Sequence, residues 1–372
     1  MDKKRKILQV FYEPLLSGIS RHVMYLLKSV ENEPYDFMVL CATADEKIPQ
    51  ALNRTVGENH VRMVPPGRFF CLTGFLEAMR IIRSQKVDTI HVHNLQSAPW
   101  AYAAAVLSGC ERIIFTPQVD SIGTGSFEWL FRQLWKVLKP MTAMYIAVSK
   151  TQQARMLRWG IARPGKVKTI ANHIDESELL KKCRNDRQTV RKNNGLPENA
   201  VVVSQMARLD RQKNPFFLIR VAELTREKAP KVLFAMIGDG PLKRSLEREI
   251  ETRNLNGRVR LMGYRHDGPE LLNASDIVTL TSRWEGLPYA LLEAICLKKP
   301  VVVTDIPGNR DLVANGESGY LAKTPEEFSE KLVKLARSKE LRDQMGNDGY
   351  RRNKDLFNPS HLARLMREIY DS

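Results

Sequence analysis

Residues 277–294 read IVTLTSRWEGLPYALLEA, which combines a strand, a turn and a helix. The run Ile277–Leu280 is short and apolar, as is typical of a strand that is buried on both faces. Gly286 and Pro288 mark a turn that opens a helix, because proline fits the first helical position, where no backbone N–H is needed. A buried strand that leads directly into a helix predicts a parallel sheet covered by helices.

The rest of the chain repeats this alternation of short β-branched runs and helical stretches. The expected strands are Ile7–Phe11, Phe37–Cys41, Val61–Val64, Thr89–His93, Ile113–Thr116, Tyr145–Val148, Val167–Ile170, Val201–Gln205, Val232–Ile237, Val259–Met262, Ile277–Leu280 and Val301–Thr304. Expected helices include Gly74–Ser84, Ala98–Leu107, Pro215–Glu227, Leu242–Thr252 and Tyr289–Leu297. We therefore expect an α/β protein in which each half forms its own doubly wound sheet.

The stretch between Asp175 and Ala200 is polar, contains a glycine and a proline, and is followed by a new buried strand at Val201. Such a polar connection between two apolar regions is typical of a domain boundary. We expect one domain at 1–176, a second at 177–356, and a closing amphipathic helix at 357–372 that packs back on the first domain.

The composition fits a folded enzyme-sized protein. The 372 residues exceed one ordinary core, and 43% hydrophobic with 27% charged residues argues against disorder. No apolar run approaches the ~18 to 20 residues that span a bilayer, and the apolar stretch after the first lysines is shorter than a signal peptide's core. The five cysteines are scattered without a CxxC pair or zinc spacing. These features predict a cytoplasmic protein.

The formal net charge is +16, and both halves contribute to it. Such a charge favours anionic partners: nucleic acid, phosphorylated small molecules or an acidic membrane surface. Composition does not choose between them.

The turn after Ile277–Leu280 suits a phosphorylated ligand. Ligands of open α/β sheets bind beyond the carboxyl ends of strands, and the free amides of a helix N-terminus hold a diphosphate. Glu285 and Glu293 would accept hydrogen bonds from sugar and ribose hydroxyls. The alternative is that both are solvated charges near a helix end, which are common.

A second polar loop, QMARLDRQKN at 205–214, follows the strand Val201–Gln205. Its Arg208 and Lys213 suit a leaving diphosphate, because cations stabilise the charge that develops during bond cleavage. The alternative is a solvated basic loop. Gly18 follows the first strand and would let the backbone approach a ligand, but it lies in no GxGxxG, which disfavours a nicotinamide enzyme.

The run EGLPYALLEA resembles the E-x7-E signature of the retaining, GT-B-fold glycosyltransferases of family 4. The resemblance covers nearly the whole chain and extends to bacterial polysaccharide and lipopolysaccharide enzymes. It includes Ala207–Leu209 with Lys213, Ile237–Pro241, Gly263, Pro300–Thr304 followed by Gly308, and Asn172–Asp175. It implies two Rossmann-like domains that face each other across a cleft, the first for the acceptor and the second for the nucleotide sugar.

The same resemblance implies a role for each matching residue. The catalytic residues would be Arg208, Lys213 and Glu285. The donor-binding residues would be Gly18, Arg208, Lys213, Tyr264, Arg265, Glu285, Gly286, Leu287, Tyr289 and Glu293, with Tyr264 and Arg265 against the base. Because cationic side chains and helix dipoles stabilise the phosphates in such enzymes, neither a metal nor a cofactor is expected.

One position departs from the family pattern. Many members carry a histidine where this chain has Gln118, which forms hydrogen bonds but cannot carry a proton at neutral pH. We place Gln118, Asp120 and His93 on the acceptor or sugar side as candidates. For His93, a hydrogen-bonded structural histidine is the alternative.

The segment SFEWLFRQLWKVLK at 126–139 has an apolar helical face, two tryptophans and a basic flank. Such a helix can lie in a membrane interface, although a helix that covers a sheet has the same apolar stripe. We expect salt-sensitive docking to the inner face of the cell membrane as a hypothesis.

Together these features predict transfer of a sugar from a UDP- or GDP-sugar to a glycan or lipid-linked acceptor. The open alternatives are an epimerase or sucrose-forming synthase of the same architecture, and a non-catalytic homologue that binds donor or a partner enzyme. A nucleic-acid module is disfavoured, because no aromatic and basic single-strand motif is present.

Overall fold

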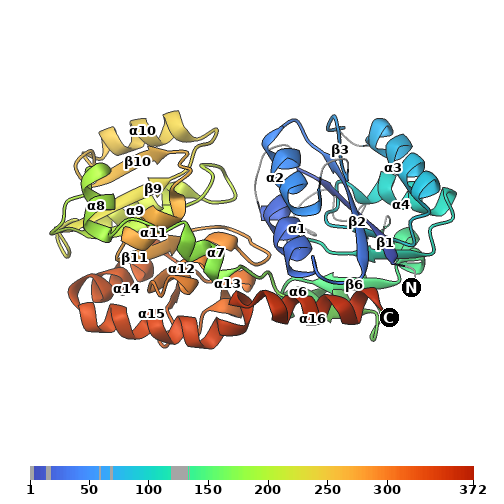
Figure 1. Ribbon diagram of the computed structural model, residues 1–372. Helices are drawn as coiled ribbons and strands as arrows, with labels where there is room; N and C mark the ends of the chain where they lie inside the picture. Colours follow the sequence, from blue (N-terminus) through green and yellow to red (C-terminus); the bar gives the residue numbers. More distant parts are fainter. Residues whose placement is uncertain (1–3, 14–17, 58–59, 68–69, 119–132, 134) are drawn as a thin grey trace. The chain divides into compact units, whose positions relative to one another are not determined.

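The computed structural model describes residues 4–13, 18–57, 60–67, 70–118, 133 and 135–372. The chain divides into two compact units: unit 1 is 1–173 with 359–372, and unit 2 is 174–358. Each unit has one parallel sheet with covering helices, as Figure 1 shows. The predicted α/β class with two doubly wound sheets is confirmed.

In unit 1 the described strands are all parallel, in the order β3-β2-β1-β4-β5-β6-β7. The strands are β1 (Arg5–Tyr12), β2 (Tyr35–Ala42), β3 (Val61–Val64), β4 (Thr89–Val92), β5 (Arg112–Phe115), β6 (Met144–Ala147) and β7 (Val167–Thr169). The helices are α1 (Gly18–Ser29), α2 (Lys47–Val56), α3 (Leu72–Gln85), α4 (Ala98–Leu107), η1 (Lys139–Met141), α6 (Lys150–Arg158) and α16 (Pro359–Tyr370). The strand order reverses between β1 and β4, where ligands of such sheets bind.

Two hydrophobic layers enclose this sheet. Leu8 and Val10 of β1 face the core under α3, α4 and α6, whereas Ile7 and Phe11 face the core under α1, α2 and α16. The closing helix α16 belongs to the second layer, and the guanidinium of Arg5 donates to the carbonyl of Tyr370 at 2.7 Å. The chain's last helix therefore completes the core of unit 1.

In unit 2 the described strands are also parallel, in the order β10-β9-β8-β11-β12-β13. The strands are β8 (Val201–Met206), β9 (Val232–Ile237), β10 (Val259–Gly263), β11 (Ile277–Leu280), β12 (Val301–Thr304) and β13 (Tyr320–Ala322). The helices are α7 (Glu176–Lys181), α8 (Arg187–Asn193), α9 (Pro215–Leu224), α10 (Lys243–Thr252), α11 (Gly268–Ala274), α12 (Tyr289–Cys296), α13 (Pro307–Leu312), α14 (Pro325–Arg337), α15 (Lys339–Asn353) and η2 (Lys354–Phe357). Here the order reverses between β8 and β11.

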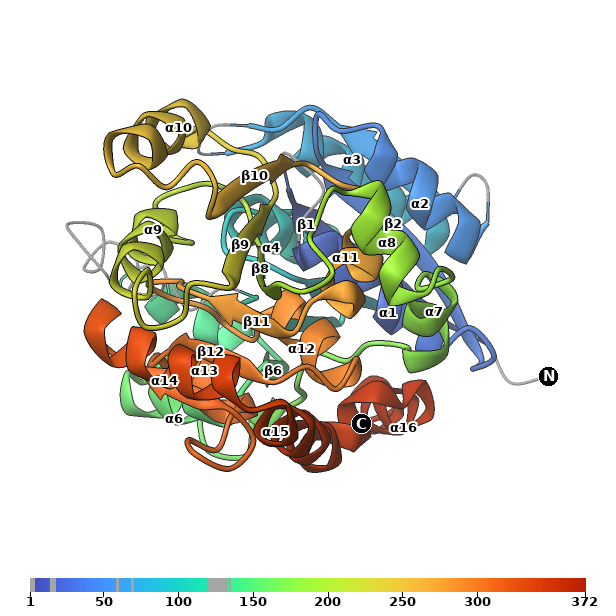
Figure 2. The ribbon, with the colours of Figure 1, turned by 90° about the vertical axis from the view of Figure 1, so that its left-hand side faces the viewer.

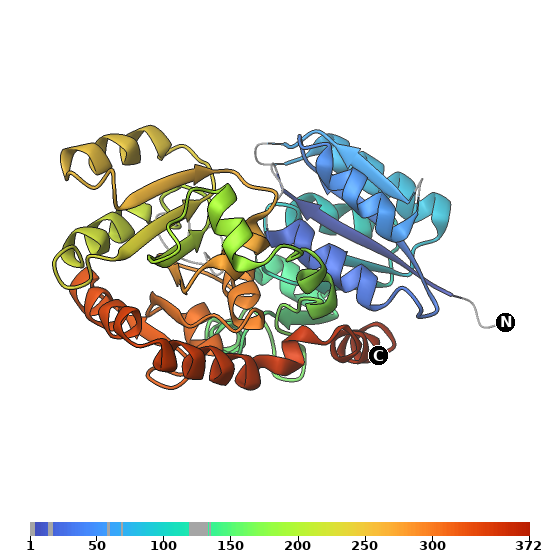
Figure 3. The same ribbon diagram turned by 60° about the vertical axis from the view of Figure 1, so that its left-hand side comes forward.

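Helices cover both faces of the second sheet. Figure 2 shows α9 and α10 on one side of the strands and α8 and α11 on the other, in agreement with the two core clusters of this unit. Helices α14 and α15, orange to red in Figure 3, contact each other, and α14 also packs on α9.

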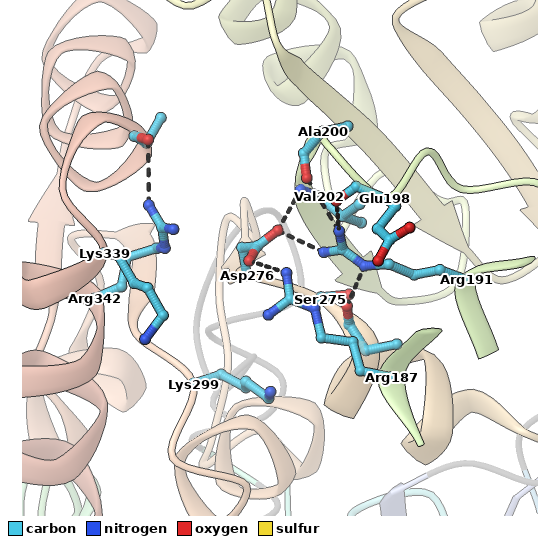
Figure 4. A network of polar contacts seen from close by, with 12 residues as sticks. Arg187, Arg191, Glu198, Ala200, Val202, Ser275, Asp276, Lys299, Lys339 and Arg342 are labelled. Atoms are coloured by element: carbon cyan, nitrogen blue, oxygen red, sulfur yellow. Dashed lines mark hydrogen bonds and ion pairs between the residues drawn. The ribbon is translucent and has the colours of Figure 1, made fainter. Parts of the chain in front are cut away.

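A buried arginine fastens α8 to the second sheet (Figure 4). The guanidinium of Arg191 donates to the carbonyls of Ala274, Glu198 and Ala200 at 2.9 to 3.1 Å and to the carboxylate of Asp276 at 2.6 Å. Asp276 also accepts the backbone N–H of Val202 at 2.8 Å. This network ties the start of unit 2 to the amino ends of β8 and β11.

Three features differ from the sequence-based expectation. The boundary stretch folds into α7 and α8, because Asp175 and Asp186 cap their N-termini. Strand β13 has only three residues, too few for a detectable pattern. Pro288 is the N-cap of α12 rather than its first helical residue, with its carbonyl accepting the N–H of Leu291. Within the described ranges, no helix combines the length and apolar character that crossing a bilayer requires.

Candidate functional site

Two loops meet at the carboxyl edge of the second sheet, where the strand order reverses. The loop after β8 carries Gln212, whose carbonyl accepts the N–H of Arg283 at 2.8 Å and whose side-chain amide donates to the carbonyl of Trp284 at 3.0 Å. The hydroxyl of Thr281, directly after β11, donates to the carbonyl of Lys213 at 2.9 Å. These bonds join the loops, although the connected residues lie about 70 positions apart.

The contact at the centre of this edge is an ion pair between Lys213 and Glu285. The Nζ atom of Lys213 lies 2.5 Å from Oε1 of Glu285, which also accepts the hydroxyl of Ser282 at 2.5 Å. The side chains are 21% and 7% exposed, respectively. The structure thus brings two predicted site residues together as a cation beside a hydrogen-bond acceptor.

Arg208 lies on the same loop and is held by Asp210. Its Nε atom donates to Oδ2 of Asp210 at 2.8 Å, while Oδ1 accepts the backbone N–H of Lys213 at 2.9 Å. The Arg208 side chain is 56% exposed, so its guanidinium is accessible. Sequence reasoning missed Asp210 as the residue that orders this loop. Its position, two residues after one candidate cation and three before the other, is the signal for it.

Both glutamates of the E-x7-E pattern are buried: Glu285 is 6% exposed and Glu293, on α12, is 4% exposed. The alternative of solvated helix-end charges is therefore wrong. A buried carboxylate is costly unless hydrogen-bond donors surround it. Gly286, Leu287 and Tyr289 lie between the two glutamates, in the turn and at the start of α12, whose N-terminal amides form the positive end of the helix dipole.

Two further loops pack closely against the backbone of the site loops, and each does so at a glycine. A Cβ on Gly308, after β12, would lie 2.4 Å from the carbonyl oxygen of Gly286, and one on Gly238, after β9, would lie 2.0 Å from that of Ala207. Gly238 also has a φ of 144°, which L side chains rarely adopt. Both positions therefore require glycine for close backbone packing.

Tyr264 and Arg265 follow β10 at the same edge of the sheet. Tyr264 is 56% exposed, with its ring edge-on to His266 at 5.0 Å between centroids. Arg265 donates to both carboxylate oxygens of Asp267 at 2.8 and 2.6 Å, and this interaction lowers the pKa of Asp267. The phenol ring of Tyr264 is thus exposed at the carboxyl edge of the second sheet.

In unit 1, Gly18 is the first residue of α1. The carboxylate of Glu13, which is buried, accepts the N–H groups of Ile19 at 3.1 Å and Ser20 at 2.8 Å. In this structure a side-chain carboxylate thus caps the helix end where Gly18 was expected to let the backbone approach the donor. Sequence reasoning did not single out Glu13.

His93 follows β4 and is fully buried, with Nε2 2.6 Å from Oε1 of Gln9. The alternative that His93 is a hydrogen-bonded histidine is therefore confirmed as far as its buried bond to Gln9 is concerned. Burial lowers the pKa of His91 and His93 well below its usual range and that of His22 to about 4. These imidazoles are neutral at neutral pH. Gln118 lies after β5 and is 8% exposed, and Asp120 lies outside the described residues.

The predicted membrane segment at 126–139 lies mostly outside the described residues. Of its described part, Trp135 is 2% and Leu138 5% exposed, and both belong to the core under α3 and α4. The ring of Trp135 lies 4.7 Å from that of Phe115. Trp135 therefore covers the sheet and is not available to a membrane, which corrects that part of the expectation.

The described residues contain no group of three or more histidine, cysteine, aspartate or glutamate side chains arranged to hold a metal. The five cysteines are free thiols.

Two family models match the chain in succession: Glycosyltransferase Family 4 over residues 16–178 and Glycosyl transferases group 1 over residues 186–352. The UDP-Gal:alpha-D-GlcNAc-diphosphoundecaprenol alpha-1,3-galactosyltransferase of Escherichia coli is 27% identical over 99% of this chain and 96% of its own length. The putative glycosyltransferase EpsD of Bacillus subtilis is 24% identical over 81% of each chain.

Solved structures share the fold. HepE of Anabaena, in complex with UDP and glucose, matches with a TM-score of 0.84 at 18% identity and covers 99% of both chains. A sucrose-phosphate synthase from Thermosynechococcus elongatus matches with a TM-score of 0.80 at 17% identity, over 99% of this chain and 98% of its own. These likenesses confirm the predicted GT-B fold. The chain belongs to the family 4 glycosyltransferases and is an enzyme of this class.

Proposed function

We propose that the enzyme transfers a sugar, with retention of the anomeric configuration, from a UDP-sugar to a lipid-linked glycan acceptor in the assembly of a bacterial surface polysaccharide. The relative in Escherichia coli is named for a UDP-sugar donor and a diphosphoundecaprenol-linked acceptor, and it spans nearly the same length. In this proposal unit 2 binds the donor and unit 1 the acceptor.

The observation that carries the donor site is the contact of Lys213 with Glu285 across the two loops at the reversal point of the second sheet. Lys213 and Arg208 would neutralise the diphosphate as it departs, since preorganised cations stabilise charge that develops in the transition state. Glu285 would accept hydrogen bonds from the hydroxyl groups of the donor sugar, and Glu293 would accept them from the hydroxyl groups of the ribose. Tyr264 and Arg265 would flank the base, and no metal would be required.

A donor panel tests the reaction. The full chain is incubated with several UDP- and GDP-sugars, and release of UDP or GDP is measured with and without a lipid-linked acceptor. We expect UDP release that increases when the acceptor is present. Tight nucleotide binding without turnover of any donor would instead support a non-catalytic homologue, and formation of a new nucleotide sugar would support an epimerase.

A lipid-linked acceptor requires access to a membrane, and one helical layer of unit 1 is suited to it. Helices α3, α4 and α6 carry five large exposed apolar side chains, whereas the described helices α1, α2 and α16 carry none. These residues are Leu72, Leu76, Val106, Leu107 and Leu157. Arg80, Arg83 and Arg158 lie on the same helices, whose one acidic residue, Glu77, pairs with Arg80. We propose that this layer docks on an anionic bilayer surface.

Sedimentation with vesicles that contain anionic lipid tests the docking. We expect binding at low salt that decreases as salt is added, because exposed charges are screened. Changing both Leu72 and Leu76 to serine should weaken it, whereas the control Leu180→Ser in unit 2 should not. No binding at low salt would refute the docking surface.

A further inference from the structure

A chain of buried hydrogen bonds runs from the last helix of unit 1 to His93. Gln9 connects two members of it: Oε1 lies 2.6 Å from Nε2 of His93, and Nε2 donates to the hydroxyl oxygen of Tyr370 at 3.0 Å. The same hydroxyl lies 2.9 Å from Nδ1 of His91, whose Nε2 lies 2.8 Å from the hydroxyl of Thr116. All five side chains are fully buried, so solvent does not compete for these bonds.

The donors and acceptors fix where the hydrogens lie. The amide oxygen of Gln9 only accepts, so Nε2 of His93 must carry the hydrogen. The amide nitrogen of Gln9 only donates, so the Tyr370 oxygen accepts from it, and the same oxygen lies within hydrogen-bond distance of Nδ1 of His91. Because burial lowers the pKa of both histidines, each imidazole keeps a single hydrogen. Nδ1 of His93 is therefore a lone-pair acceptor.

A second acceptor of the same kind lies beside it. Nδ1 of His22 lies 3.0 Å from Oδ1 of Asn172, which accepts its hydrogen, so that Nε2 of His22 carries a lone pair. The rings of His22 and His93 are 5.4 Å apart between centroids. Within the described part of the chain, neither Nε2 of His22 nor Nδ1 of His93 has a hydrogen-bond partner, although both atoms are buried.

The two neutral acceptor nitrogens, Nε2 of His22 and Nδ1 of His93, determine which chemical groups can bind beside them. A buried acceptor without a donor is unfavourable, and a ligand hydroxyl removes this cost by donating its hydrogen. A phosphate or carboxylate oxygen has no hydrogen to donate and would be repelled. His93 directly follows β4, where the strand order of the first sheet reverses between β1 and β4, and this reversal is the expected ligand position of the sheet. The chemistry of the two nitrogens therefore fits the hydroxyl groups of a sugar.

We propose that His22 and His93 together accept hydrogen bonds from hydroxyl groups of the acceptor sugar, and that Gln9 and Tyr370 position His93 in the tautomer that this requires. The inference rests on the proposed function for the identity of the ligand, but the tautomer of His93 follows from the hydrogen bonds alone. Tyr370 acts through Gln9 and is a positioning residue on the closing helix α16.

Nitrogen NMR of the full chain labelled with ¹⁵N-histidine tests the tautomer directly. We expect His93 to show a hydrogen on Nε2 and none on Nδ1. Tyr370→Phe keeps the ring that packs in the core but removes the hydroxyl, so His93 should populate both tautomers. The KM for the acceptor should rise about tenfold, the effect of losing one hydrogen bond, while the KM for the donor should stay within about twofold.

Tyr35→Phe is the matched control. The hydroxyl of Tyr35 donates to Asp371 at 2.8 Å, at the end of the same helix, and its ring lies 5.4 Å from that of Tyr370, but Gln9 and His91 are not its partners. It should leave the tautomer of His93 and the KM for the acceptor unchanged. The same changes in Tyr35→Phe as in Tyr370→Phe would show general loosening of α16 and overturn the proposal.

A hydrogen on Nδ1 of His93 in the unaltered protein would also overturn it, as would a Tyr370→Phe variant with unchanged tautomer and KM. Absence of turnover with every donor would refute the proposed function instead, because the NMR signature does not depend on turnover.

Discussion

Lys213→Ala is expected to lower turnover more than ~100-fold, because removing one preorganised group that stabilises transition-state charge has about this effect. In the structure Lys213 is the cation in contact with Glu285, and its backbone N–H is fixed by Asp210. The variant also leaves the 7% exposed Glu285 without its ion-pair partner. Initial rates at saturating donor, together with the melting temperature, separate lost catalysis from lost folding.

Lys243→Ala is the control for this result. Lys243 follows the neighbouring strand β9, and its side chain is 40% exposed and pairs with Asp239 at 3.7 Å, not with a carboxylate of the loops after β8 and β11. Its turnover should stay within about twofold of the unaltered enzyme, since exposed ion pairs contribute little. An unchanged rate in Lys213→Ala would mean that the diphosphate site is assigned to the wrong residue.

Arg191→Ala is expected to destabilise unit 2 by about 3–5 kcal/mol, because it leaves the buried Asp276 without its buried partner. The Asp276 side chain is 5% and the Arg191 side chain 2% exposed. The variant also removes the donor for the carbonyls of Ala274, Glu198 and Ala200. Hydrogen exchange at the N–H of Val202, which Asp276 accepts, reports on this unit separately from unit 1.

Arg187→Ala provides a comparison at the same carboxylate. Arg187 contacts the other oxygen of Asp276 at 2.5 Å, as Figure 4 shows. The side chain of Arg187, however, is 47% exposed. Its removal should cost no more than about 1 kcal/mol. Equal effects of the two substitutions would show that burial does not determine the strength of these contacts.

The sequence alone was sufficient to predict the buried strands that determine the fold class. Parallel strands buried on both faces appear as apolar runs, and for this reason Val232–Ile237 and Ile277–Leu280 were predicted with the limits that the structure shows. Short elements were not detectable: β13 has three residues and follows Gly319.

The site was predictable in its residue types but not in its contacts. Lys213 and Glu285 each follow a strand, yet their contact depends on β8 and β11 being neighbours, which the periodicity of the sequence does not determine. The bond of Gln9 to Tyr370 joins opposite ends of the chain and has no local signal. The burial of Glu293 likewise follows from packing around α12 and not from its spacing.

The central claim is that the loops after β8 and β11 hold the diphosphate of a nucleotide sugar. A crystal structure of the full chain with UDP tests it most directly. We predict diphosphate oxygens within hydrogen-bond distance of Lys213 and Arg208, and the ribose hydroxyls on the carboxylate of Glu293. Ordered UDP whose diphosphate contacts neither cation, or UDP bound elsewhere in the molecule, would contradict the account.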